Sequence, residues 1–292
     1  MNPPKNQPQP QSRPRPSLNA LLGLDAVIDV VDIGASPLSG SGAAPYKRLL
    51  DAGHARVVGF EPDAEQLAKL NAQKGPNERY IGQAVYDGAA HELKICRAAG
   101  MTSLLEPNRE LLDYFHGFPE WGEVLKRVPV DTVRLDDVVE ITNIDYLKID
   151  IQGGELEVFR NGTRLLSDGL VIHTEVEFLP MYLDQPLFAD VDLFLRDLGF
   201  VFHRFQPLTS RVIKPLAVNN DIYAGLSQAF WADAVFVRDF TKFDALDERD
   251  LHKTALILHD IYGSYDLALR ALMASDAKTD GKLAETYLAK LN

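Results

Sequence analysis

Three short apolar, β-branched runs separated by helical segments open the sequence, and this alternation limits the fold more than any other feature. The runs cover residues 26–33, 55–60 and 79–85. Near-continuous hydrophobicity is typical of strands that are buried on both faces, as in parallel sheets. Helical patterns occupy residues 45–52 and 63–72 between them, and Asp63 is the expected N-cap of the second helix. A β-α-β-α-β order of this kind predicts a parallel, doubly wound sheet.

The regular alternation breaks after the third run. A turn at Asp87 and Gly88 precedes a strand pattern at 91–97, so we expect a β-hairpin with 79–85. A long loop is expected at 206–227. Further strands are predicted at 128–135, 145–151, 170–178, 200–205 and 229–238. The pattern predicts an α/β fold with a Rossmann-like doubly wound, mostly parallel seven-stranded sheet and an inserted β-hairpin.

The two ends of the chain differ from the middle. Residues 1–16 are rich in Pro and Gln and carry no acid, which is typical of a disordered tail. They lack the apolar core of a signal peptide. From Asp244 onward the pattern is helical. We therefore expect a tail at 1–16, one α/β domain at 17–240 and a helical C-terminal extension at 241–292, which caps the domain or mediates a homodimer.

Charge and composition narrow the classes of partner. The formal net charge of -12 argues against a nucleic-acid backbone as the main partner, because such binding uses Lys and Arg to neutralise phosphates. The one cysteine, Cys96, allows no intramolecular disulfide, so the cytoplasm is the simplest compartment. No apolar run approaches the length of about 18 residues that spans a bilayer. A small-molecule or glycan partner remains compatible with this charge.

The turn after the first strand is the first candidate binding element. It reads Asp32, Ile33, Gly34, Ala35, Ser36. In doubly wound folds the ligand lies beyond the carboxyl ends of the strands, and a glycine there lets the backbone approach it closely. The segment matches neither GxGxxG nor a P-loop. Taken alone, it is equally well explained as a tight turn between a strand and a helix.

Glu61 ends the second predicted strand and is the second candidate. An acid at this place can accept hydrogen bonds from both hydroxyls of a ribose. Pro62 follows it and suits the start of a helix, since it has no backbone N–H to satisfy. The alternative is that Glu61 only interacts favourably with a helix N-terminus.

Two later strands carry charges that a buried strand does not normally tolerate. Lys148 and Asp150 share one face of the segment 145–151, and such charges are costly unless they are paired or functional. A structural pair of Lys148 with Asp150 or with Glu155 is the alternative. His173 and Glu175 share one face of the next strand, near the expected position of Asp150.

Glu177 lies on that face as well, two positions further on. There we expect a solvated strand end with no functional role.

Together these segments resemble the FkbM-type family of S-adenosylmethionine-dependent methyltransferases. The likeness covers about residues 25–240, with further family-like stretches at 102–104 and 231–236. The matching segments are Asp-Ile-Gly-Ala at 32–35, Gly-Phe-Glu-Pro at 59–62, Leu-Lys-Ile-Asp-Ile-Gln-Gly-Gly-Glu at 147–155 and His-Thr-Glu-Val-Glu-Phe at 173–178. The resemblance implies a class I methyltransferase that uses S-adenosylmethionine and acts on oxygen in sugars or secondary metabolites.

One stretch departs from the family form. The Asn and the second Gly of its first motif are missing here, where Ser36 is followed by Pro37 and an insertion. This departure affects the expected contacts of the methionine end.

The resemblance assigns roles to individual residues. Asp150 is the expected base or substrate-orienting residue, and His173 and Glu175 assist it. Glu61 is expected to hold the ribose. Gly34 and Ala35 are expected to line the methionine portion, and Gln83 or Ala84 to contact the adenine. Asp32, Ser36 and Pro62 are the other expected cofactor-binding residues. The aromatic segment 101–124 either lines the acceptor pocket or forms a minor hydrophobic core.

Three other interpretations stay open at this point. Asp150 and Glu175 could together hold a divalent cation such as Mg²⁺, although a metal is not the leading expectation. A nicotinamide-dependent oxidoreductase would suit Glu61 but lacks GxGxxG. A non-catalytic nucleotide-binding module of the same fold is the third.

Overall fold

The computed structural model describes residues 16–36 and 42–291. Apart from Pro16, the tail expected at 1–16 lies outside the described residues. The segment that begins with Pro37, where the sequence departs from the family form, also lies outside them.

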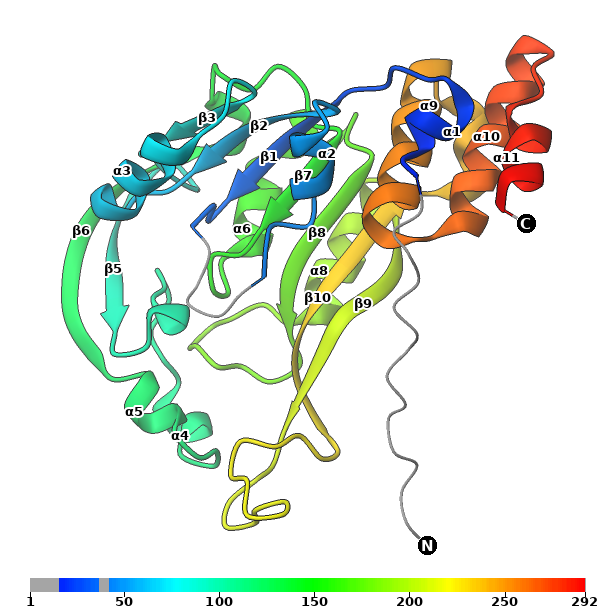
Figure 1. Ribbon diagram of the computed structural model, residues 1–292. Coiled ribbons are helices and arrows are strands. Elements are labelled where there is room, and N and C mark those ends of the chain that lie inside the picture. The colour runs from blue at the N-terminus through cyan, green and yellow to red at the C-terminus, as the bar shows by residue number, and fades with distance from the viewer. Residues whose placement is uncertain (1–15, 37–41, 292) are drawn as a thin grey trace, which may run out of the picture.

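A seven-stranded sheet with the order β3-β2-β1-β7-β8-β10-β9 forms the centre of the molecule (Figure 1). Within this sheet β10 alone runs in the direction opposite to the other strands, so the mostly parallel, Rossmann-like sheet is confirmed. Its strands are β1 (Ile28–Ile33), β2 (Ala55–Phe60), β3 (Glu78–Ile81), β7 (Tyr146–Ile149), β8 (Val171–Glu177), β9 (Phe200–Arg211) and β10 (Gln228–Arg238).

Helices cover both faces of this sheet. The N-terminal and C-terminal helices share one hydrophobic core with it, and α6 to α8 share another on the opposite face. The helices are α1 (Leu18–Leu22), α2 (Lys47–Asp51), α3 (Ala64–Gln73), α4 (Arg109–Leu112), α5 (Phe118–Trp121), α6 (Glu155–Arg160), α7 (Thr163–Leu166), α8 (Phe188–Asp197), α9 (Glu248–Ile257), α10 (Tyr265–Thr279) and α11 (Leu283–Leu291). Four short turns of other helix types are η1 (Ala99–Met101), η2 (Leu135–Asp137), η3 (Phe240–Ala245) and the π-helical η4 (Leu258–Tyr262).

The alternation of side chains explains why one face of the sheet is apolar at its amino end and polar at its carboxyl end. Val30, Tyr146 and Val171 face the C-terminal helices and are buried. The next residue on that face of each strand is Asp32, Lys148 or His173, so polarity increases toward the carboxyl ends. The polar residues found in the sequence therefore gather at one edge of the sheet.

The prediction of an inserted β-hairpin at 79–97 is wrong. The chain breaks at Gly82 and Gln83, and β4 (Ala84–Tyr86) leaves the main sheet. It does not pair with β5 (Ala90–Cys96), because β6 (Val124–Arg134) lies between them in a three-stranded sheet of order β4-β6-β5. A local turn signal at Asp87 and Gly88 could not reveal that β6, a strand about 30 residues later, would pair with both β4 and β5.

The loop predicted at 206–227 begins too early. Strand β9 continues to Arg211 and pairs with β10 through several register shifts. The two strands form a long hairpin that extends past the rest of the sheet (Figure 1). Such irregular pairing is hard to recognise from alternation alone.

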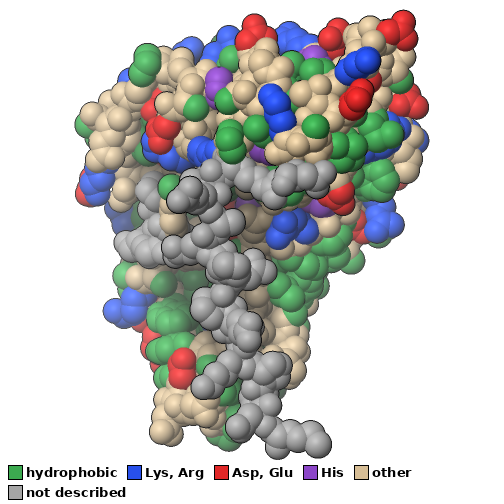
Figure 2. Space-filling view, turned by 45° about the vertical axis from the view of Figure 1, so that its right-hand side comes forward, with side chains coloured by type: hydrophobic (Ala, Val, Ile, Leu, Met, Phe, Trp, Pro, Cys, Tyr) green, Lys and Arg blue, Asp and Glu red, His purple; other side chains and the backbone are tan. Residues whose placement is uncertain are grey.

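The C-terminal extension is packed against the sheet. Residues of α9, α10 and α11 belong to the same hydrophobic core as β1, β7 and β8. Lys253 of α9 is 2 % exposed, and its amine donates to Asp145 at 2.6 Å, just before β7. On the outer surface of this part, acidic and basic side chains are interspersed (Figure 2). Within the described residues, no helix is long and apolar enough to cross a membrane.

Candidate active site

A cavity of about 570 Å³ lies at the carboxyl ends of β1, β2 and β7. Seven of the predicted site residues line it, namely Gly34, Ser36, Glu61, Pro62, Gln83, Ala84 and Asp150. The inserted sheet closes the other side with apolar residues that include Leu93, Ile95 and Val130. This is the position at which doubly wound folds bind their ligands.

The turn after β1 has a geometry that requires glycine. Gly34 has a φ of 78°, and a Cβ at this position would lie 2.1 Å from the backbone oxygen of Asp150. The backbone N–H groups of Gly34 and Ala35 both donate to the carbonyl of Phe60, at 3.1 and 3.0 Å. The turn is therefore pinned between β2 and β7, with Gly34 on the cavity wall.

Asp32 supports this turn from behind. It is 2 % exposed and is not among the described residues that line the cavity. The hydroxyl of Tyr46 donates to Asp32 Oδ2 at 2.5 Å, and Lys148 Nζ lies 3.3 Å from Oδ1. The same amine donates to the carbonyl of Gly34 at 3.0 Å. Asp32 therefore acts on the turn through Lys148.

The buried phenol beside Asp32 stays protonated. Burial, followed by the charge of Asp32, raises the pKa of Tyr46 far above its usual range. Tyr46 can therefore only donate to Asp32. The sequence suggested pairs of Lys148 with Asp150 or Glu155, and the structure gives a pair with Asp32 instead.

The end of β2 presents an acid to the cavity. Glu61 is 8 % exposed, and its Oε1 accepts from the backbone N–H of Asp63 at 2.8 Å. Asp63 in turn caps α3 through the N–H of Gln66, as the sequence predicts. This bond fixes one carboxylate oxygen of Glu61 and leaves the group on the cavity wall.

Ser36 supplies a polar atom that awaits a partner. Its hydroxyl is buried and has no hydrogen bond within the described residues. Because it lines the cavity, this oxygen is one that a bound ligand could satisfy.

Asp150 and Glu175 are joined by one side chain that the sequence did not single out. The amide nitrogen of Gln152 donates to Asp150 Oδ1 and to Glu175 Oε2, each at 2.7 Å. Gln152 has a φ of 62°, which a non-glycine residue adopts only when its surroundings require it. Its carbonyl accepts from the hydroxyl of Ser103 at 2.7 Å. The strained turn therefore places one amide between two acids.

The acids behind this bridge share a low-polarity environment. Burial, followed by the charge of Asp150, raises the pKa of Glu175 well above its usual range. Burial also raises the pKa of Glu177 well above its usual range and that of Glu155 to about 7. Glu177 is 1 % exposed, so the expectation of a solvated strand end is wrong. Strand β8 pairs edge to edge with β10 over its whole length, and Glu177 lies beside Trp231.

His173 lies one row deeper than the cavity. It is 5 % exposed and is not among the described residues that line the cavity. Its Nδ1 is 3.0 Å from the hydroxyl of Tyr262 in η4, and its Nε2 is 3.5 Å from Asp233 Oδ2. The structure thus links this histidine to β10 and to the C-terminal extension.

Three acids form a row along this edge of the sheet. Thr174 lies beside Ile149, which places Asp150 next to Glu175, and Glu175 lies beside Asp233. The charges of Asp150 and Asp233 both raise the pKa of Glu175, as expected for neighbours. The residue numbers of Asp233 and Glu175 are far apart, and only the antiparallel register brings them together.

The aromatic residues of 101–124 mainly form the minor hydrophobic core. Phe115 and Phe118 are buried and pack against Phe230 of β10, with ring centroids 4.4 and 4.9 Å away. Trp121 stacks on Tyr223. From this segment Thr102 and Leu104 reach the cavity wall.

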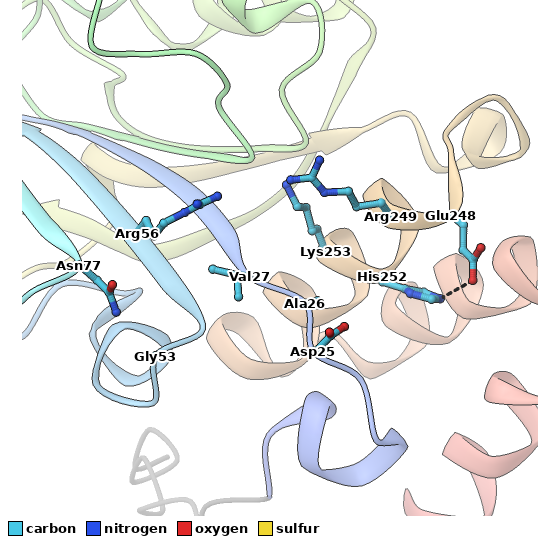
Figure 3. A pocket seen from close by; sticks show the side chains of 10 residues that line it. All are labelled: Asp25, Ala26, Val27, Gly53, Arg56, Asn77, Glu248, Arg249, His252 and Lys253. Carbon is cyan, nitrogen blue, oxygen red and sulfur yellow. Dashed lines mark ion pairs between the residues drawn. The ribbon is translucent and has the colours of Figure 1, made fainter.

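A second cavity, of about 610 Å³, lies at the amino end of the sheet (Figure 3). Arg56 of β2 and Lys253 of α9 lie on its wall, and Asp29 binds the guanidinium of Arg56 at 2.8 Å. His252 is bonded to the hydroxyl of Ser275. The topological rule for this fold places ligands at the opposite end, where the first cavity lies.

Some of these groups could not be found by sequence reasoning. Gln152 was visible in the Gln-Gly-Gly segment, but its bridging position depends on a left-handed backbone. Asp233 stands in one of the family-like stretches but gained importance only from its register with Glu175. No local pattern indicated Tyr262, which lies 89 residues after His173.

Comparison with known proteins agrees with this geometry. A family model described as the methyltransferase FkbM domain matches residues 32–202. A 2-O-methyltransferase, NoeI, of Sinorhizobium fredii (strain NBRC 101917 / NGR234) is 28% identical over 183 residues, which cover 56% of this chain and 70% of the relative.

Solved structures show only a weak likeness. Magnesium protoporphyrin IX methyltransferase of Synechocystis PCC 6803 with bound SAM is 14% identical, with a TM-score of 0.38, over 76% of each chain. Precorrin-6y C5,15-methyltransferase of Geobacter metallireducens GS-15 is 14% identical, with a TM-score of 0.36, over 76% of this chain and 84% of that one. The strand order and the family match, and not these scores, carry the assignment. The matched range includes the turn at Gly34, the acid Glu61 and the Asp150–Glu175 bridge, and by that match the chain belongs to the FkbM methyltransferase family.

Proposed function

We propose that this protein transfers the methyl group of S-adenosylmethionine to a hydroxyl oxygen of a sugar, glycan or secondary metabolite. The observation that carries the proposal is a single cavity whose wall holds Gly34, Glu61, the Gln83–Ala84 break and Asp150. These are the places where a nucleoside cofactor and a proton acceptor are needed together.

The residues on the wall fit the parts of the cofactor. Glu61 would accept hydrogen bonds from the ribose hydroxyls, with its Oε1 already fixed by Asp63. Gly34, which has no Cβ, would let the methionine portion lie against the backbone. The buried hydroxyl of Ser36 would find its partner there. Gln83 and Ala84, between two sheets, would border the adenine.

Asp150 would do the chemistry that the protein itself must supply. S-adenosylmethionine supplies the electrophilic methyl group when bound. Asp150 would accept the proton of the attacking hydroxyl, while Gln152 holds its other oxygen by donating to Oδ1. Among the described residues, Oδ2 of Asp150 has no hydrogen-bond donor, so it is the oxygen available for this proton. Positioning of the hydroxyl by the cavity would supply much of the rate gain.

An oxygen acceptor is supported by the relative and by the wall. The named relative is a 2-O-methyltransferase. Carboxylates accept hydrogen bonds from neighbouring sugar hydroxyls, and apolar side chains such as Leu93 and Ile95 suit the carbon face of a ring.

The hydrogen bonds at Asp150 support direct base catalysis over metal assistance. The amide nitrogen of Gln152 lies between the two carboxylates that would hold a cation, and an amide N–H is a donor and not a ligand. Within residues 16–36 and 42–291 no group of three or more His, Cys, Asp and Glu side chains is arranged to hold a metal. Activity should therefore persist in EDTA, and loss of activity that Mg²⁺ restores would contradict this.

Two measurements test the proposal. Calorimetry with S-adenosylmethionine, S-adenosylhomocysteine and NAD should give binding of the first two alone. Radiolabelled S-adenosylmethionine should then label members of a panel of p-nitrophenyl glycosides. Binding of NAD alone would favour an oxidoreductase. Cofactor binding without transfer to any acceptor, glycoside or polyol, would favour a non-catalytic module.

A further inference from the structure

Tyr262 brings the C-terminal extension to the face of the sheet that carries the acids. It is the last residue of the π-helical turn η4, 6 % exposed, and it lies outside the matched family range. Its ring stacks on that of His173 with centroids 6.1 Å apart. A π-helical turn is uncommon and is often found at functional sites, where it redirects a side chain.

The protons of this buried chain can be placed by counting donors. The hydroxyls of Tyr146 and Tyr262 lie 2.8 Å apart, and Tyr262 also reaches His173 Nδ1 at 3.0 Å. Burial raises the pKa of both phenols, so each hydroxyl keeps its proton and must donate it. Among the described residues, the hydroxyl of Tyr146 has Tyr262 as its hydrogen-bond partner.

One arrangement leaves no buried donor unpaired. Tyr146 donates to Tyr262, and Tyr262 donates to Nδ1 of His173. The reverse arrangement would leave the Tyr146 hydroxyl, on a fully buried residue, without an acceptor, at a cost of about 1–3 kcal/mol. The proton of a neutral His173 therefore belongs on Nε2.

The other side of the imidazole gives an independent argument for the same tautomer. Nε2 faces Asp233 Oδ2 at 3.5 Å, and a carboxylate favours an N–H over a lone pair in that direction. Asp233 has a side chain 38% exposed, so it is open to a ligand. It continues the row formed by Asp150 and Glu175.

We propose that Tyr262 is a positioning residue that holds His173 as its Nε2–H tautomer, and that His173 in turn orients Asp233 as a further acceptor-binding carboxylate. The step from Asp233 to the acceptor rests on the proposed function, whereas the tautomer of His173 does not. In this arrangement the C-terminal extension completes the active site. The ligand class at Asp233 is a hydroxyl-bearing or cationic part of the acceptor, since a carboxylate offers only acceptor atoms.

The tautomer is read from the ring nitrogens of His173 by NMR of the full chain labelled with ¹⁵N-histidine. At about pH 8, where imidazoles are normally neutral, we expect a protonated Nε2 and an unprotonated Nδ1. His173→Gln identifies the signal. Tyr262→Phe keeps the ring and removes the hydroxyl, and it should shift His173 toward a mixture of tautomers. A proton on Nδ1 in the wild type, or an unchanged signal in Tyr262→Phe, overturns the proposal.

A matched control separates this effect from the loss of any buried hydroxyl. Tyr287 is also buried in the C-terminal extension, and its hydroxyl bonds to His259 Nδ1 at 2.7 Å. Tyr287→Phe should lower the unfolding midpoint about as much as Tyr262→Phe does, and it should leave the His173 signal unchanged. A shift of that signal in Tyr287→Phe would show that general loosening, and not Tyr262, sets the tautomer.

The acceptor step is tested on the p-nitrophenyl glycoside that is methylated best. Asp233→Asn should lower kcat/KM for this glycoside about tenfold and leave the dissociation constant of S-adenosylhomocysteine unchanged. Tyr262→Phe should lower the same ratio by a smaller factor, and Tyr287→Phe should not change it. If Asp233→Asn has no effect on kcat/KM, Asp233 does not contact the acceptor. If no cofactor binds, the proposed function fails while the NMR result stands.

Discussion

At the amino end of the main sheet, charged side chains occur in matched pairs. Arg56 binds Asp29, and Lys253 binds Asp145, with both members of the second pair 2% exposed. At the carboxyl end, Lys148 forms an ion pair with Asp32. Among the described residues, no Lys or Arg forms an ion pair with Asp150, Glu175 or Asp233, and His173 Nε2 lies 3.5 Å from Asp233.

This difference separates a structural cluster from the proposed functional one. Paired buried charges hold α9 against the sheet. Removing one partner leaves the other charge buried without compensation, which lowers the stability of the fold. Carboxylates that are buried close together resist ionisation, and burial, followed by the charge of Asp150, raises the pKa of Glu175. Such an arrangement is typical of a place where a ligand supplies the missing partners.

The largest effect should be on turnover, and it should come from the carboxyl end of the sheet, which carries the row of acids. Asp150→Asn removes the proposed base, and we expect turnover to fall about 10²–10⁴-fold with little change in cofactor affinity. Initial rates and calorimetry measure the two quantities. Asp25→Asn, in the cavity at the amino end, is the control and should leave turnover unchanged. Normal turnover in Asp150→Asn would refute its role as the base.

At the amino end of the sheet, where the charges are paired, a substitution should change stability instead. Lys253→Met leaves Asp145 buried without its cation, and we expect a loss of about 3–5 kcal/mol in the free energy of unfolding. Adding Asp145→Asn to this variant should recover most of the loss, because no charge is then left buried. Urea unfolding measures both. Equal stability of Lys253→Met and the wild type would mean that the pair does not hold α9.

The buried acids at the carboxyl end of the sheet should also make stability depend on pH. Burial raises the pKa of Glu155 from its usual 4.5 to about 7, so the folded protein keeps a proton that the unfolded chain loses. This contribution is present in full below about pH 4.5 and is lost as the pH rises through 7. We expect a fall of about 2–4 kcal/mol over that window, by linkage.

Urea unfolding at several pH values checks this dependence. Glu155→Gln should make it shallower, because the amide can still accept from the N–H of Ile151 but does not titrate. The dependence that remains comes from Glu175 and Glu177, whose pKa values are also raised. Glu157→Gln, on the same helix with a side chain 32% exposed, should keep the dependence of the wild type. Identical slopes in Glu155→Gln and the wild type would assign the effect to another group.

The smallest predicted effect concerns the cofactor. Glu61→Gln weakens the acceptor of two charge-assisted hydrogen bonds, and the affinity for S-adenosylhomocysteine should fall about tenfold or more. Glu65→Gln is a matched control on α3, with its side chain 79% exposed. Calorimetry compares the two. An unchanged affinity in Glu61→Gln would remove Glu61 from the proposed ribose site.

Much of the fold and part of the site followed from local patterns. The buried runs at 26–33 and 55–60 and the cap at Asp63 could be predicted because hydrophobic periodicity and capping act over a few residues. Asp150 was singled out because charge in a buried strand is costly unless it is paired or functional. Glu61 was singled out because an acid at the end of the second strand can accept hydrogen bonds from a ribose.

The errors have a common physical origin. The prediction of a hairpin at 79–97 was wrong because β6, which is distant in the sequence, pairs with both β4 and β5. Glu177 was expected in solvent because its neighbouring strand β10 belongs to a later part of the chain. In both cases a non-local contact overrode the local preference.

The sequence by itself determined the sheet, the turn at Gly34 and the identity of the acids at its carboxyl edge, because strand periodicity places them there. Only the tertiary structure decided how these acids are connected. The bridge through Gln152 needs a left-handed backbone, the row ending at Asp233 needs an antiparallel register, and the bond from Tyr262 needs a helix that returns to the sheet. Each depends on contacts between distant residues, which no local pattern specifies.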